Sequence, residues 1–257
     1  MFRLTVNRLF QQFGLSPLTH RLPSQCAVCK SWPAEPVCEP CVARFCSRAQ
    51  RCSQCAVALP ADLSLGQASP RSVCFDCIKQ PPPVNKTLVA VDYAYPWSAL
   101  ITQYKFADQP GWAAFFAKLM LANPAIKQVF DPLSPSDVIV PIPLATQRLQ
   151  TRGFNQAWEL ATQLAAQSGS QGKTDATLLW RVKNTPPQTQ LKRQARMDNV
   201  RDAFQIDPLR AASVAGKRVV LVDDVMTSGA SLFTAAEVLR AAGAVHITGV
   251  VLARTPL

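Results

Sequence analysis

A chain of 257 residues is long for one small domain and short for three, so its length predicts one domain of ordinary size and one smaller module. Hydrophobic residues make up 48% of the chain and charged residues 17%, a balance that excludes collagen-like, disordered and coiled-coil proteins. The formal net charge of +11 favours a nucleic-acid or phosphate partner, and no apolar run approaches the roughly 18 residues of a membrane-spanning helix.

In chain order, the first feature is a set of nine cysteines, eight of which form four Cys-x-x-Cys pairs. The segment before them lacks the continuous apolar stretch and the cleavage site of a signal peptide, so we expect a cytoplasmic protein. Disulfides do not persist in that reducing compartment, and four close pairs suit tetrahedral coordination of zinc. We therefore expect two zinc sites, with the ligands Cys26, Cys29, Cys38, Cys41, Cys52, Cys55, Cys74 and Cys77.

The spacing of the pairs leaves open how they share two metals. Consecutive pairing closes a loop of eight residues between the first and second pairs and one of eighteen residues between the third and fourth. We favour it because the longer loop lies in the zinc-ribbon range. A cross-brace would instead join the first pair with the third and the second with the fourth. The ninth cysteine, Cys46, is expected to be a buried thiol, and loading both sites with zinc lowers the net charge to about +7.

Three prolines, residues 81–83, follow the last pair and cannot continue a helix or a central strand. We place the domain boundary here, so that residues 1–83 form the N-terminal segment with a double zinc-ribbon module and residues 84–257 form a second domain. Beyond the prolines, segments typical of strands and helices alternate, which predicts an α/β fold with a parallel sheet. The expected strands are 88–95, 138–140, 218–222 and 247–252, and the expected helices are 111–122, 156–167 and 231–242.

The residues suited to chemistry concentrate directly after the strand 218–222. Asp223 and Asp224 stand at its carboxyl end, where open α/β sheets bind their ligands. A loop of small and hydroxyl-bearing residues and a helix N-terminus follow, and together they can cradle a phosphate. The residues of this loop are Thr227, Ser228, Gly229, Ala230 and Ser231. Because carboxylates accept hydrogen bonds from a vicinal diol, the pattern predicts a phosphorylated ribose, although a plain turn with two solvated aspartates is the alternative interpretation.

The segment 219–231 lacks the Gly-Lys-Ser/Thr ending of a P-loop and the three glycines of a dinucleotide-binding turn. It resembles the phosphoribosyl pyrophosphate (PRPP) signature of type I phosphoribosyltransferases, and nearly the whole chain resembles the ComF family. The resemblance is carried by several motifs in the same order. These are the paired zinc knuckles, the prolines, Tyr104-Lys105-Phe106, the stretches 141–157 and 185–204, and the tail that ends near Arg254.

The ComF resemblance implies a type I phosphoribosyltransferase-like parallel sheet with a small N-terminal four-cysteine zinc module. It implies a pyrophosphate loop formed by Pro141, Ile142, Pro143 and Leu144. Arg148 and Arg152 stand close enough in sequence to neutralise the pyrophosphate.

A mobile loop that closes over PRPP is also implied. Its basic residues are Lys192, Arg193, Arg196 and Arg201. The resemblance gives catalytic roles to Asp223, Asp224 and Arg196, with Mg²⁺ accompanying PRPP. The alternative interpretation of this basic segment is a solvated loop.

Two functions follow from the resemblance. The ComF family implies a part in natural competence, handling incoming single-stranded DNA beside the uptake machinery at the inner membrane, with PRPP or a phosphorylated end bound by the fold. The alternative is an active small-molecule phosphoribosyltransferase, which displaces pyrophosphate from C1 of PRPP and attaches a base or an amine. Pyrophosphate release from PRPP with a panel of acceptors distinguishes the two.

The basic window 181–201 leads to a first prediction. Replacing Lys192, Arg193 and Arg196 together by alanine should lower the slope of log K against log salt for single-strand binding by up to about 2, because each neutralised phosphate contributes about 0.7. Binding of all sequences should weaken alike, as anisotropy titrations at several salt concentrations would show. A loop that serves PRPP alone would lose PRPP affinity with the slope unaltered, and no change in either ligand would indicate a solvated loop.

Overall fold

The computed structural model describes residues 24–32, 34–46, 49–60, 73–106, 109–131, 133–134, 136–182 and 203–256. The chain forms two compact units, Met1–Phe45 and Cys46–Leu257. The first unit holds helix α2 (Glu39–Phe45) and the first two cysteine pairs, and the second holds the sheet and the last two pairs. The domain boundary at residue 83 stays a prediction, since compactness does not test independent folding.

A four-stranded parallel sheet lies at the centre of the second unit, in the strand order β1-β6-β5-β2. Its strands are β1 (Lys86–Asp92), β2 (Val138–Pro141), β5 (Arg218–Met226) and β6 (His246–Arg254). The two central strands are apolar and buried over most of their length, as is typical of parallel strands covered on both faces. The predicted parallel α/β sheet is therefore confirmed.

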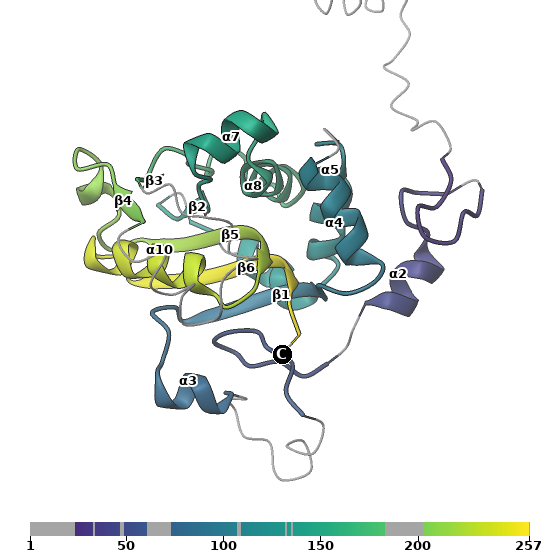
Figure 1. Ribbon diagram of the computed structural model, residues 1–257. Coiled ribbons are helices and arrows are strands. Elements are labelled where there is room, and N and C mark those ends of the chain that lie inside the picture. Colours follow the sequence, from purple (N-terminus) through teal and green to yellow (C-terminus); the bar gives the residue numbers. More distant parts are fainter. Residues whose placement is uncertain are drawn as a thin grey trace, which may run out of the picture. The chain divides into compact units, whose positions relative to one another are not determined.

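Helices cover both faces of the sheet (Figure 1). The crossover from β5 to β6 is α10 (Ala230–Ala241), which lies on one face. The opposite face carries α4 (Trp97–Phe106), α5 (Trp112–Leu121), α7 (Thr146–Arg152) and α8 (Gln156–Gln167). Helix α6 (Pro124–Phe130) contacts α5 and β1. Right-handed crossovers explain this division. The connection from β1 to β2 runs across the sheet in the opposite direction to the connection from β5 to β6, and the chain after α8 first returns in parallel beside β2, where Thr174 pairs with Ile139. Within the described ranges, no helix has both the length and the apolar character to cross a membrane.

The observed elements differ from the predicted ones in several places. Strand β1 runs from Lys86 to Asp92, whereas the predicted strand runs from 88 to 95, and helices α4 and α6 are not among the predicted helices. Strand β5 extends to Met226, so that Asp223 and Asp224 lie within the strand rather than after it. The sequence does not predict α7, because this helix buries no residue and has no apolar pattern. It also does not predict the short antiparallel pair β3 (Leu179–Arg181) and β4 (Phe204–Ile206), which is too brief to show alternation.

The eight paired cysteines gather into two groups of four. In each group the Sγ atoms lie within 4.8 Å of one another, so each group could hold one metal ion. The grouping is the consecutive one and not a cross-brace: Cys26, Cys29, Cys38 and Cys41 form the first group, and Cys52, Cys55, Cys74 and Cys77 form the second. Cys46 belongs to neither group and is half-buried, and burial raises the pKa of its thiol.

The two cysteine groups repeat the same local structure. The residue after the second cysteine, Lys30 or Ala56, has a positive φ of 64° or 57°. The main-chain N–H of the third cysteine, Cys38 or Cys74, donates to Sγ of the first over 3.3 Å. A short helix then begins with the next residue, as α2 in the first group and as α3 (Phe75–Lys79) in the second. N–H groups that point at sulfur stabilise thiolates, which are the form that binds zinc.

The second cysteine group is continuous with the core of the sheet. Cys52, Cys55 and Cys77 are buried in the same hydrophobic cluster as Val89 of β1 and Leu232 of α10. The segment that carries these cysteines, residues 52–77, is too short to build a core of its own and depends on a metal or a neighbouring domain for stability. Here the neighbouring domain supplies apolar contacts from both its sheet and its helix.

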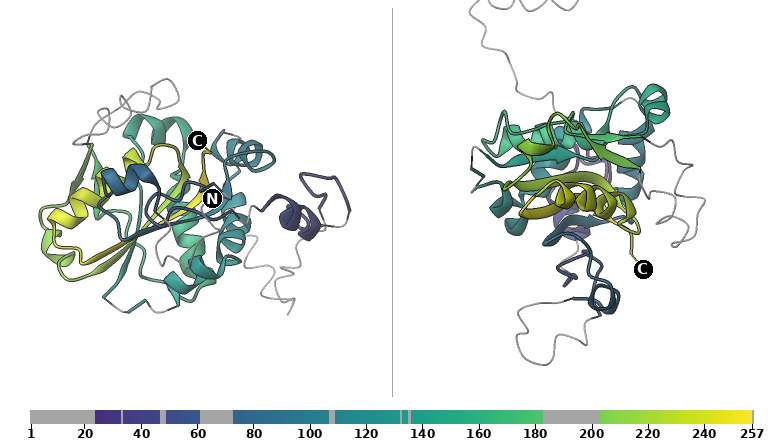
Figure 2. Two further views of the ribbon diagram at one scale, coloured as in Figure 1. Left: turned by 90° about the horizontal axis from the view of Figure 1, so that it is seen from below. Right: turned by 90° about the vertical axis from the view of Figure 1, so that its left-hand side faces the viewer.

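This cysteine group also covers the outer edge of β1, the edge that does not pair with β6 (Figure 2). Thr87 of β1 donates from its N–H to the Ser53 carbonyl over 2.9 Å and from Oγ1 to the Gln54 carbonyl over 2.6 Å. An ion pair of 2.8 Å joins Arg51 to Asp92 at the end of the strand. An uncovered edge strand leaves N–H and C=O groups unpaired, so these contacts stabilise the edge of the sheet.

The unequal packing of the two groups predicts unequal effects of metal loss. Elemental analysis should give about two zinc ions per chain, and the double variants Cys52→Ser with Cys55→Ser and Cys26→Ser with Cys29→Ser should each lose one. Only the first of these should strongly lower the melting temperature of the sheet domain, because its metal lies against the core. The second variant is the matched control. Equal shifts of the melting temperature, or zinc-free wild-type protein, would contradict the prediction.

Candidate functional site

The two acids predicted to bind a ligand lie near the carboxyl end of the central strand β5. Asp224 is buried, and its N–H donates to Oδ1 of Asp223 over 2.8 Å. Burial and repulsion from Asp224 raise the pKa of Asp223 to about 7, against the opposing attraction of Lys105. The charge of this pair at neutral pH therefore depends on the cations around it.

Lys105 is in direct contact with the acid pair. Its Nζ lies 3.0 Å from Oδ2 of Asp224, and the two side chains are only 17% and 12% exposed. The preceding residue, Tyr104, donates from its buried hydroxyl to the Gln156 carbonyl over 2.8 Å and packs edge-on against the ring of Phe116. This anchor fixes the last turn of α4 and thereby places Lys105 at the acids.

Three arginines extend the positive charge around the acids. Arg152 at the end of α7 interacts electrostatically with Asp224, and Arg181 at the end of β3 interacts with Asp223. Burial lowers the pKa of both arginines and repulsion from Arg148 lowers it further, while the acids oppose the shift. Lys105, Arg152 and Arg181 thus interact with the two carboxylates, and Arg148 adds charge near the two arginines, so the site attracts an anion.

The sequence did not assign a site role to Lys105 or Arg181. Arg148 and Arg152 are expected from the family resemblance, whereas Lys105 appears there only inside a motif, with no role. A usable signal for Lys105 exists, because the buried residues of α4 follow helical spacing and end at Tyr104. Arg181 lies in a strand of three residues and leaves no comparable signal in the sequence.

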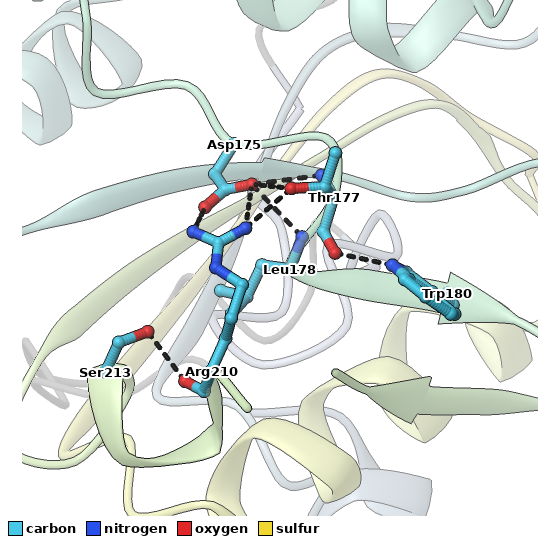
Figure 3. Close-up of polar contacts among 6 residues, drawn as sticks. All are labelled: Asp175, Thr177, Leu178, Trp180, Arg210 and Ser213. Atoms are coloured by element: carbon cyan, nitrogen blue, oxygen red, sulfur yellow. Dashed lines mark hydrogen bonds and ion pairs between the residues drawn. The ribbon is translucent and has the colours of Figure 1, made fainter. Parts of the chain in front are cut away.

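A polar cluster around Asp175 holds the strand pair that carries Arg181 (Figure 3). The Asp175 carboxylate accepts hydrogen bonds from the N–H groups of Thr177 and Leu178 over 3.0 and 3.1 Å, and it forms an ion pair with Arg210. Burial would raise the pKa of Asp175, but the hydrogen bonds from Arg210 and Thr177 outweigh it and lower that pKa. The cluster fixes the start of β3 against the segment after β4.

The loop after β5 places a helix N-terminus beside the acids. Gly229 is the N-cap of α10 and has a φ of +85°. A Cβ atom at this position would lie 2.6 Å from the side chains of Met226 and Phe233, so glycine is required by both conformation and space. Ser228 accepts a hydrogen bond from the Ala230 N–H over 3.3 Å and completes the turn. First-turn N–H groups and nearby hydroxyls are the donors that a phosphate needs.

The segment expected to bind pyrophosphate follows β2, the neighbour of β5 in the sheet. Pro141 is the last residue of β2, and the Ile142 N–H donates to the Val222 carbonyl over 2.9 Å. Proline has no N–H, so Pro141 and Pro143 offer none to a ligand either. Of the four residues in the predicted loop, only Leu144 retains a main-chain donor for an anion.

The predicted mobile loop lies outside the described residues. Lys192, Arg193, Arg196 and Arg201 belong to the segment 183–202, which connects β3 to β4. The catalytic role expected of Arg196 and the closure of this loop over PRPP therefore stay predictions.

Comparison with known proteins identifies the domain that carries these residues. Residues 149–256 match the phosphoribosyl transferase domain family. The DNA utilization protein YhgH of Salmonella typhimurium is 32% identical over 219 residues, which cover 85% of this chain and 90% of that protein. The protein of the same name from Escherichia coli is 32% identical over 83% of this chain and 90% of its own length. Competence protein F of Haemophilus influenzae is 32% identical over 174 residues, or 68% of this chain and 75% of that protein.

The chain belongs to the ComF family. In this ComF-family chain the matched domain contains the acid pair, the loop after β5 and the arginines at 152 and 181. Lys105 and all eight paired cysteines lie N-terminal to it. Lys105, which contacts Asp224, is therefore supplied by a part of the chain that the phosphoribosyltransferase match does not include.

The raised pKa of Asp223 predicts how stability depends on pH. In the unfolded chain the Asp223 carboxyl has the ordinary aspartate pKa of about 3.9. In the folded protein its pKa is about 7. Folding is therefore opposed increasingly as the pH rises from about 4 to about 7, and the opposition is constant above that range. The melting temperature of Asp223→Asn, relative to that of wild type, should therefore rise as the pH increases from 5 to 7.

Scanning fluorimetry between pH 5 and pH 8 measures this difference. The matched control is Glu237→Gln, which removes an exposed carboxylate from α10. A difference between Asp223→Asn and wild type that does not vary with pH would mean that Asp223 ionises normally in the folded protein.

Proposed function

We propose that this ComF-family chain binds PRPP or another phosphorylated ribose at the carboxyl end of β5. The observation that carries the proposal is the placement of Asp223 and the buried Asp224 beside a glycine-capped helix N-terminus, with Lys105, Arg152 and Arg181 interacting with these acids. The phosphate binds the loop 227–231, and the ribose hydroxyls donate to Asp223 and Asp224. Lys105 and the arginines offset the charge of the pyrophosphate. Mg²⁺ accompanies PRPP and takes carboxylate oxygens as ligands.

Zinc is proposed as the metal of both cysteine groups. Four sulfur ligands within 4.8 Å of one another match a closed tetrahedral site of the structural kind. The N–H groups that donate to sulfur in each group support the same assignment. When bound, zinc stabilises the fold and leaves no open position for chemistry.

The biological role that we propose is the uptake and handling of single-stranded DNA on the cytoplasmic side of the inner membrane. The names of the relatives, DNA utilization protein and Competence protein F, support it. Support also comes from two exposed aromatic residues next to site cations in sequence. Phe106, 68% exposed, follows Lys105, and Trp180, 53% exposed, precedes Arg181. Aromatic side chains beside cations are typical of surfaces that bind single strands.

An active small-molecule phosphoribosyltransferase is the second candidate function. The arginines beside the acid pair favour it, because they can stabilise a departing pyrophosphate. Pyrophosphate release from PRPP, measured with a panel of bases and amines, separates the two candidates. Release with one acceptor supports transfer, whereas PRPP binding without release, together with salt-dependent single-strand binding, supports the uptake role.

Calorimetry with PRPP and Mg²⁺ tests the proposed ligand. Replacing Asp223 and Asp224 together by asparagine should weaken PRPP binding by about tenfold or more, because each lost charge-assisted hydrogen bond costs roughly 1.5 to 3 kcal/mol. Zinc content should stay the same, and Glu237→Gln, on the exposed side of α10, should bind PRPP like wild type. Unchanged affinity in the double variant would place the ligand elsewhere on the molecule.

A further inference from the structure

A buried arginine at the end of β6 bridges the second cysteine group and the loop that follows β5. Arg254 is only 5% exposed. Its Nε donates to the Cys55 carbonyl over 3.0 Å. Its Nη1 donates to three further carbonyls, those of Met226 at 3.2 Å, Thr255 at 3.0 Å, and Thr227. One guanidinium group thus binds the main chain of a cysteine knuckle, the start of the loop and the C-terminal tail.

Both ends of this bridge are fixed by local structure. The peptide after Cys55 is oriented by Ala56, whose φ of 57° is held in the left-handed region. At the other end, the Thr255 N–H also donates to the Met226 carbonyl, over 3.1 Å. The Met226 side chain occupies the space that a Cβ atom at Gly229 would need. A shift of Met226 therefore moves the N-cap of α10, where the phosphate is proposed to bind.

We propose that Arg254 is a positioning residue through which a metal at the second cysteine group and an anion at the loop 227–231 stabilise each other. Metal binding orders the knuckle, because Cys55 is one of its four ligands. Arg254 binds the carbonyl of that ligand and, on its other side, holds Met226 and Thr227 in place. The proposal rests on the proposed function, since it takes PRPP as the ligand of the loop.

The chemistry of the side chain supports this role. A guanidinium group is planar, stays charged and presents five N–H donors in a fixed geometry. It can therefore bind carbonyls from three segments at once and hold them at set distances. A lysine ammonium group is a compact point charge on a flexible stem and cannot keep the same three segments in register.

Coupling between two sites is reciprocal. If the metal at the second group raises the affinity for PRPP, bound PRPP must raise the affinity for that metal by the same factor. The first cysteine group belongs to the other compact unit, Met1–Phe45, so it can be removed to measure the zinc affinity of the second group alone.

The test measures zinc affinity in the double variant Cys26→Ser with Cys29→Ser, which retains the second group alone. Zinc is titrated against a chromophoric chelator at equilibrium, with excess Mg²⁺, in the absence and presence of saturating PRPP. We expect PRPP to raise the zinc affinity by about fivefold or more, the lower end of ordinary allosteric coupling. Adding Asp223→Asn and Asp224→Asn to the same background is the control for zinc binding by free PRPP, and it should abolish the increase.

Arg254→Lys in the same background then tests the bridge itself. We expect this variant to bind both zinc and PRPP, with the coupling factor reduced to about one. A purely structural role would lower stability and leave the coupling factor unchanged. If Arg254→Lys does not fold, the effect of PRPP on the protein with Arg254 intact still tests the coupling, and its absence would overturn the proposal.

The possible failures are distinguishable. If calorimetry shows that PRPP does not bind the wild-type chain, the proposed function is wrong and the inference falls with it. If PRPP binds but leaves the zinc affinity of the second group unaltered, or if Arg254→Lys retains the full coupling factor, the bridge through Arg254 is wrong and the proposed function stands.

Discussion

Burial and repulsion between the two carboxylates near the end of β5 oppose ionisation of Asp223, and the cations of the site counter this effect. The cations that offset it come from three separate parts of the chain: Lys105 from the crossover between β1 and β2, Arg148 and Arg152 from the helix after β2, and Arg181 from the short strand β3. Each is positioned by its own local structure, such as the buried Tyr104 hydroxyl for α4 and the Asp175 cluster for β3. The result is a site with carboxylates and surrounding cations, the combination that the proposed phosphorylated ribose requires.

The parallel sheet explains why these groups can meet. In a parallel sheet the loops after neighbouring strands emerge at the same edge, so the loop after β5 lies beside the segment after β2. The antiparallel pair β3 and β4 then brings Arg181 to this edge, and the C-terminal end of β6 brings Arg254 to the base of the loop. Residues that are far apart in sequence thereby share one site. The helices on both faces bury the apolar side chains of the central strands.

The cysteine groups show how one local motif can serve two structural contexts. Both groups have a left-handed residue after the second cysteine, an N–H to sulfur hydrogen bond from the third cysteine and a short helix after it. The first group belongs to a small compact unit, whereas the second packs into the core of the sheet and covers the edge of β1. A metal bound at the second group would therefore stabilise the sheet itself, and the carbonyl of Cys55 connects this group to the end of β6.

The sequence by itself determined the features that depend on short spacings. The four Cys-x-x-Cys pairs, the strand that leads into Asp223 and Asp224, the glycine-bearing loop and the alternation of strands with helices are all visible without coordinates, because each is encoded within a few consecutive residues. The tertiary structure decided which of these features meet. The consecutive grouping of the cysteines, the ion pair of Lys105 with Asp224 and the bridge through Arg254 join distant segments, and they depend on how crossovers pack against the sheet. No local pattern encodes that packing, since the same lysine or arginine in another register would be an ordinary solvated cation.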